Sequence, residues 1–133
     1  MKEHFFWVGL GGGLGSMARY ACSGWAARLF GDTFPWGTLI VNVVGSFVIG
    51  FVGTLTSPDG RWLLAPAGRN FILLGFCGGY TTFSSFSLQT LRLLDGGEWG
   101  QAGANVVGSV VACLLAVWMG HALAAWLNST RAS

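Results

Sequence analysis

The residues most suited to binding an ion or lining a path lie in one apolar stretch, residues 75–87 (GFCGGYTTFSSFS). Two adjacent glycines followed by two threonines disfavour a continuous helix, because glycine is flexible and threonine is stiff at its β-carbon. A broken helix frees backbone carbonyls. Inside a membrane these are tolerated only where they line a cavity, coordinate an ion or lie buried in protein. The pattern therefore indicates an ion site or a lined path at this point.

Two phenylalanines follow the predicted break. Phe83 and Phe86 are three residues apart, so they share one face of a helix, with Ser87 beside them. Packing or lipid contact would explain such a pair by itself. The adjoining break and hydroxyl groups favour a functional role, since ring edges and hydroxyl hydrogens carry partial positive charge.

Two further stretches carry polar side chains at a spacing of four residues, which places them on one helical face. One stretch has Thr38, Asn42, Ser46 and Thr54, with Gly50 at the same spacing, and the other has Asn105, Ser109 and Cys113. An asparagine inside a membrane is costly unless it is satisfied, so Asn42 is expected to face protein or water. For Asn105 and Ser109, bonding to a neighbouring helix and facing a polar path explain the pattern equally well.

Carboxylates are absent from all the long apolar stretches, where Arg19 is the single charge. The sequence shows no Ser-His-Asp combination, metal-binding cluster or phosphate loop, so no enzymatic activity is predicted. The apolar stretches thus combine the cationic Arg19 with freed carbonyls, hydroxyl groups and aromatic ring edges, and they hold no carboxylate. This combination indicates a path for an anion.

The composition is that of a membrane protein. Of 133 residues, 53% are apolar and 9% are charged, whereas a soluble domain has about 25% charged residues. The net charge of +2 gives no indication of nucleic-acid binding. The composition excludes a disordered chain and disfavours a soluble enzyme.

Four transmembrane helices are predicted within a single domain, residues 1–133. A bilayer core of about 30 Å needs about 20 helical residues, and the charge-free runs meet that length except where Arg19 interrupts the first. The predicted spans are residues 5–29, 36–57, 68–92 (the broken one) and 100–127.

The charges around these spans specify orientation weakly. Four Lys/Arg residues (Lys2, Arg61, Arg69, Arg131) fall on the side with both termini, and two (Arg28, Arg92) on the other. One interpretation is a protein with cytoplasmic termini. The other is insertion in both orientations, which would permit an antiparallel dimer. Close helix packing is also predicted in the last span, where small residues recur every four positions: Ala104, Gly108, Ala112, Ala116, Gly120 and Ala124.

Three motifs together resemble the CrcB (Fluc) fluoride channel family over essentially the whole chain. They are GLGSMARY around Arg19, WGTLIVNVVGSFVIG around Asn42 and GFCGGYTTFSSFS at the predicted break. The resemblance implies a multi-pass channel of the bacterial inner membrane that exports toxic fluoride from the cytoplasm. It also implies an antiparallel, dual-topology homodimer with two pores at the subunit interface.

Carried over by motif, the resemblance assigns roles to individual residues. The backbone carbonyls of Gly78 and Thr81 would hold a structural sodium ion (Na⁺) at the centre of the dimer. Side chains lining the fluoride pore would be Asn42, Phe83, Phe86 and Ser109, with Arg19, Ser46, Ser87 and Gln89 associated with it. The family often has a glutamate at the position of Gln89 and a second hydroxyl at that of Cys113.

Two other classes are alternatives to a fluoride channel. A small four-helix multidrug exporter would need a membrane-embedded carboxylate for proton exchange, which this sequence lacks. A structural subunit of a larger membrane complex would explain the packing glycines but not the broken helix with its polar stripes. Anion flux from liposomes that contain only this protein would separate the three.

Overall fold

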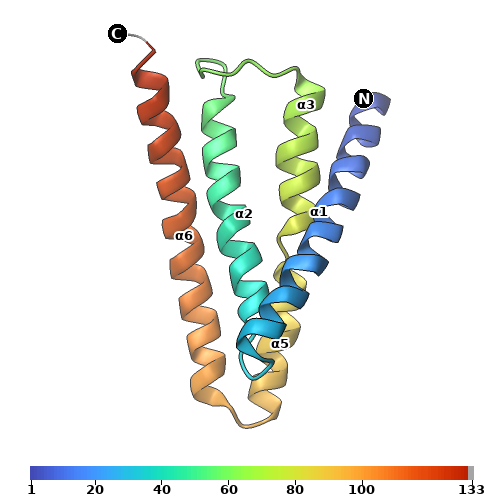
Figure 1. Cartoon of the computed structure of the whole chain (residues 1–133), viewed down its shortest axis with the longest axis vertical. Coiled ribbons are helices and arrows are strands. Elements are labelled where there is room, and N and C mark those ends of the chain that lie inside the picture. The colour runs from blue at the N-terminus through green and yellow to red at the C-terminus, as the bar shows by residue number, and fades with distance from the viewer. Residues whose placement is uncertain (132–133) are drawn as a thin grey trace.

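The computed structural model describes residues 1–131, and all regular secondary structure in that range is helical. Both ends of the described chain lie at one end of the molecule, together with the connection between α2 and α3 (Figure 1). The elements are α1 (Lys2–Phe30), α2 (Trp36–Leu55), α3 (Pro66–Asn70), the π-helical η1 (Phe71–Cys77), α4 (Gly78–Tyr80), α5 (Phe83–Asp95) and α6 (Trp99–Ser129).

Three helical stretches are long and apolar enough to cross a membrane: Trp36–Leu55, Pro66–Asp95 and Trp99–Ser129. They correspond to the predicted spans 36–57, 68–92 and 100–127. The predicted helix at 5–29 is present as α1, but α1 is not among the three because its glycines and Arg19 dilute its apolar residues. The crossing of a membrane by α1 therefore stays a prediction.

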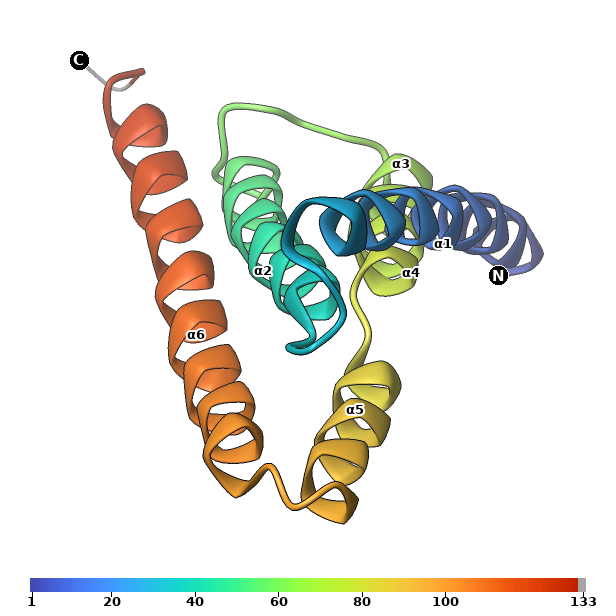
Figure 2. The same cartoon turned by 60° about the horizontal axis from the view of Figure 1, so that its bottom comes forward.

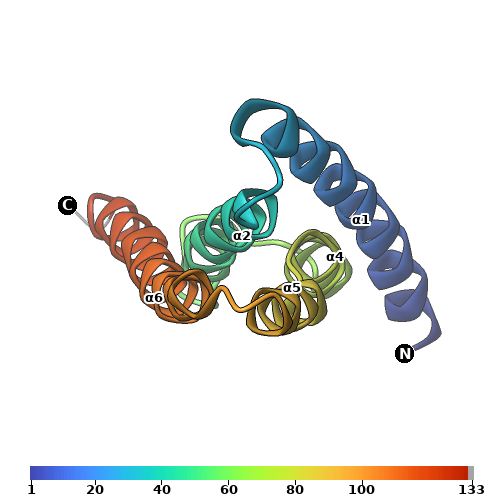
Figure 3. The same cartoon turned by 90° about the horizontal axis from the view of Figure 1, so that it is seen from below.

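The third stretch, Pro66–Asp95, is interrupted near its middle. α4 ends at Tyr80, and Thr81 and Thr82 are extended, with φ/ψ of −88°/159° and −153°/116°. α5 then begins at Phe83. Figure 2 shows this extended connection, and Figure 3 shows α5 displaced from α4 when the molecule is viewed from below.

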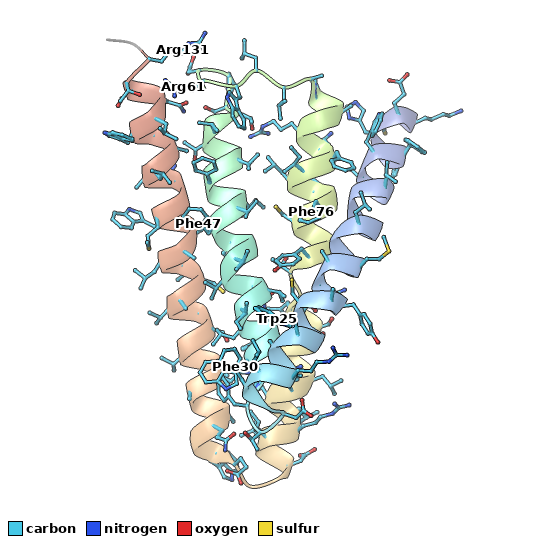
Figure 4. All side chains as sticks on the ribbon, viewed as in Figure 1. Trp25, Phe30, Phe47, Arg61, Phe76 and Arg131 are labelled. Atoms are coloured by element: carbon cyan, nitrogen blue, oxygen red, sulfur yellow. The ribbon has the colours of Figure 1, made fainter. Side chains whose placement is uncertain are left out.

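The helices pack in two pairs through glycines that leave room for a neighbouring backbone. A Cβ on Gly120 of α6 would collide with the Phe47 carbonyl of α2, and a Cβ on Gly15 of α1 would collide with the Phe76 carbonyl of η1. Figure 4 shows Phe47 beside α6 and Phe76 beside α1. Two backbones can approach this closely only where no side chain intervenes.

The predicted ladder of small residues on the last helix packs along only half of its length. Ala116, Gly120 and Ala124 are buried, whereas Ala104 and Gly108 are exposed. Four residues advance an α-helix by one turn and about 40° more, so a stripe with this spacing winds gradually around the helix. At the other end of α6, Asn105 and Ser109 are buried instead.

The close contact between α1 and η1 gives a stability prediction. Gly15→Ala should lower the free energy of unfolding by about 1–3 kcal/mol, because the added methyl group overpacks a backbone contact. Gly13→Ala is the matched control, since a Cβ there meets nothing within 4 Å. Thermal unfolding in detergent measures both, and equal stability of the two variants would contradict the packing.

A central cleft built around a broken helix

One open cleft of about 480 Å³ collects most of the residues that the sequence analysis singled out. It lies between α2, the interrupted third stretch and α6, and is called the central cleft below. Its lining includes Asn42, Ser46, Gly78, Thr81, Phe83, Phe86 and Ser109. Sequence reasoning did not assign Thr82 to this site, although Thr82 also lines it.

The amide of Asn42 bonds to both backbone groups of Thr82. The Thr82 N–H donates to Asn42 Oδ1 at 2.7 Å, and Asn42 Nδ2 donates to the Thr82 carbonyl at 3.1 Å. The side chain from α2 thus supplies the partners that the interrupted helix does not. The second hydrogen on Nδ2 is left over for another acceptor.

Thr82 also begins the helix that follows the interruption. Its hydroxyl accepts a hydrogen bond from the backbone N–H of Ser85 at 3.2 Å, which is N-capping of α5. A threonine directly before the first apolar residue of a helix, here Phe83, is a sequence signal from which this role could have been predicted.

These bonds leave two backbone carbonyls without their usual helical donors. In a continuous helix the Gly78 carbonyl would accept from the Thr82 N–H, and the Thr81 carbonyl from the Ser85 N–H. Both N–H groups are bonded to side chains instead. Backbone oxygens of this kind are suitable ligands for a hard cation. Gly78 is exposed, and a Cβ there would meet nothing within 4 Å in this chain.

The two phenylalanines beyond the interruption lie together on the wall of the central cleft. Their ring centroids are 5.4 Å apart and the rings are inclined at 46°. Phe83 is 79% exposed. The two rings are tilted relative to each other rather than stacked.

The polar residues of α6 combine both arrangements that the sequence left open. Ser109 lines the central cleft, and Asn105, which is 1% exposed, bonds to Thr90 of α5 at 3.0 Å. Sequence reasoning missed Thr90, because no periodic pattern relates α5 to α6.

Three of the predicted residues lie away from the central cleft. Gln89 lines a second cleft of about 400 Å³ near the α1–α2 connection, and its buried Oε1 has no partner among residues 1–131. The Ser87 hydroxyl donates to the Phe83 carbonyl at 2.9 Å on the exposed side of α5. Arg19 is half-buried and lines neither cleft.

Comparison with known proteins identifies the family. Residues 6–121 match the family described as "CrcB-like protein, Camphor Resistance (CrcB)". The chain belongs to the CrcB family. The match includes α2, the interrupted third stretch and most of α6, and therefore every residue named in the central cleft. With three long apolar helices, this CrcB-family chain is a multi-pass membrane protein.

Several members of the CrcB family are similar to this chain over nearly their whole length. A protein of Opitutus terrae is 60% identical over 97% of this chain and 98% of its own length. Proteins of Methylocella silvestris and Rhodospirillum rubrum are 50% and 54% identical, over 96% and 93% of this chain and 97% and 96% of their own lengths. Each of the three is named "Fluoride-specific ion channel FluC".

The bonds between Asn42 and Thr82 predict a large loss of stability on substitution. Asn42→Leu keeps the shape of the side chain but leaves two backbone groups without partners. We expect a loss of about 2–6 kcal/mol in total, since each of the two groups costs about 1–3 kcal/mol.

Ser46→Ala, one turn along α2 in the same cleft, is the matched control for Asn42→Leu. Thermal unfolding of the purified protein measures both variants. If Asn42→Leu were as stable as Ser46→Ala, the bonds from the Asn42 side chain to Thr82 would not stabilise the interrupted helix.

Proposed function

We propose that this chain is a fluoride-selective channel that exports fluoride from the cytoplasm by passive conduction and so lowers its toxicity. The observation that carries the proposal is the similarity to relatives named fluoride-specific ion channels, at 50–60% identity over nearly the full chain. The family is one of ion channels rather than enzymes. The cell location that follows is the bacterial inner membrane.

The chemistry of the central cleft supports an anion rather than a cation as the conducted ion. Fluoride is small and strongly hydrated, so its water must be replaced by donors held in place. The lining includes Asn42, which has a second amide hydrogen, and Ser109, whose hydroxyl can donate once it releases Asn105. It also includes Phe83 and Phe86, whose ring edges carry partial positive charge. No Asp or Glu lines it.

The functional unit in this proposal is an antiparallel homodimer with four membrane-spanning helices in each copy. The central cleft is open on one side, and residues beside the opening are exposed, including Gly78 and Phe83. A second copy placed across the opening would enclose the path. A two-fold axis would then generate two equivalent pores. Termini at one end of the molecule are consistent with four crossings (Figure 1).

A structural sodium ion at the two-fold axis fits the residues that are present. The Gly78 and Thr81 carbonyls lack their usual helical donors, and oxygen atoms are the ligands that hard cations take. In the proposed dimer, a second copy would contribute the same pair and complete the set. The ion would supply positive charge that holds carbonyls of two chains together.

The proposal predicts fluoride flux and its dependence on the two rings. Fluoride efflux from liposomes that contain only this protein should far exceed chloride efflux, as followed with ion-selective electrodes. Phe83→Leu and Phe86→Leu should each lower fluoride efflux about tenfold, since ring-edge contacts of about 1.4 kcal/mol are lost.

Size-exclusion elution of the same preparations is the control for folding, because leucine keeps the apolar character of the site. Equal fluoride and chloride efflux would contradict the proposed selectivity. Unchanged fluoride efflux in both leucine variants would show that Phe83 and Phe86 only pack and do not contact fluoride.

The dimer contact predicts an unusual result at Gly78. Gly78→Val has room within one chain, so each chain should still fold, but the added bulk should prevent close approach of a second copy. Particle mass in detergent should fall to that of one chain. Gly13→Val, another glycine with open space around it, should leave the dimer intact. A Gly78→Val protein that remains a dimer with normal sodium dependence would argue against this interface.

A further inference from the structure

Three side-chain hydrogen bonds connect the central cleft to the interior between α5 and α6. Ser109 Oγ donates to Asn105 Oδ1 at 3.3 Å, and Asn105 Nδ2 donates to Thr90 Oγ1 at 3.0 Å. Thr90 Oγ1 in turn donates to the Phe86 carbonyl at 2.8 Å. All three bonds run in the same direction, from Ser109 toward the Phe86 carbonyl.

This direction is the wrong one for binding an anion. A serine hydroxyl has a single hydrogen, and the bond to Asn105 Oδ1, with 3.3 Å between the two oxygen atoms, uses it. Ser109 therefore presents only lone pairs to the cleft that it lines. To donate to an anion, Ser109 must release Asn105 Oδ1, and a buried amide oxygen without a donor is costly.

The amide of Asn105 can remove that cost, because its two ends have nearly the same shape and opposite hydrogen-bonding character. Turning the amide by about 180° exchanges Oδ1 and Nδ2 at the same two neighbours. Thr90 would then donate to Oδ1, and Nδ2 would donate to Ser109. The Phe86 carbonyl would lose only the side-chain bond, since the backbone N–H of Thr90 lies in helical position to serve it.

We propose that Asn105 is a positioning residue that reverses this chain of hydrogen bonds when fluoride enters the central cleft. The inference rests on the proposed function and deepens it. Without the anion, the bonds run from Ser109 to the Phe86 carbonyl. With the anion, they run from Thr90 through Asn105 to Ser109, whose hydroxyl hydrogen points at fluoride. Both polar side-chain atoms of Asn105 keep a hydrogen-bond partner in both states, and no proton is transferred from one residue to another.

The reversal also explains how the Ser109 hydroxyl can donate to a small anion and yet have a hydrogen-bond acceptor when no anion is bound. In the reversed state Nδ2 donates to Ser109 Oγ, which polarises the hydroxyl and strengthens the bond that it gives.

A double-mutant cycle tests the inference. Asn105→Leu keeps the shape of the side chain but neither donates nor accepts, so the Ser109 hydroxyl would turn to the backbone carbonyl one turn earlier, as helical serines do. Fluoride efflux at subsaturating fluoride should fall about tenfold, as expected for one bond to a charged group. In the Ser109→Ala background the same substitution should change efflux by less than about twofold, because independent effects would add.

Two more variants keep the test decisive. Thr90→Val is isosteric and lacks the hydroxyl, so it should lower efflux with Ser109 present and have no effect in Ser109→Ala. It replaces Asn105→Leu if that variant does not elute as a folded dimer. Gln101→Leu removes an amide one turn earlier on α6, outside the three bonds, and should conduct as the unaltered protein does.

The possible results separate this inference from the proposed function. If the unaltered protein conducts no fluoride, the proposed function fails. If it conducts, and Asn105→Leu or Thr90→Val lowers efflux equally with and without Ser109, the residues act only through helix packing and the inference is overturned. Loss of the effect in Ser109→Ala supports it.

Discussion

The pair of hydrogen bonds between the Asn42 amide and the Thr82 backbone is the interaction on which the rest of the site depends. A helix interrupted inside a membrane exposes backbone groups that each cost several kcal/mol when they have no partner. Asn42 satisfies an N–H and a carbonyl at once. The Thr82 hydroxyl then caps α5. With these needs met within the chain, the Gly78 and Thr81 carbonyls are left without their usual helical donors. In the proposed function, these carbonyls and the two phenylalanines contact ions.

The glycine contacts decide where this interrupted stretch lies. α1 approaches η1 at Gly15, and α6 approaches α2 at Gly120, so two tightly packed pairs leave the central cleft between them. The cleft lining includes hydroxyl and amide side chains and no Asp or Glu, which supports the proposed anion path. Its open side, with Phe83 largely exposed, is why the proposed function needs a second copy of the chain.

Much of this could be predicted from the sequence, because membrane helices and their interruption follow from local composition. The stretch GGYTTF indicated the interruption, and the spacing of four brought Asn42 and Ser46 to one wall. Contacts between different helices could not be predicted in this way. The bond from Asn105 to Thr90 depends on how α6 folds back along α5. The exposure of Ala104 and Gly108 results from the gradual winding of the small-residue stripe around α6. The space around Gly78 likewise emerges only from the folded chain.

Current through a planar bilayer that contains only this protein tests the central claim most directly. The claim is that the central cleft forms a path that conducts fluoride and rejects chloride. With fluoride on both sides at unequal concentrations and chloride in an opposing gradient, the current should reverse at the fluoride equilibrium potential. Reversal at the chloride potential, or midway between the two, would contradict the account.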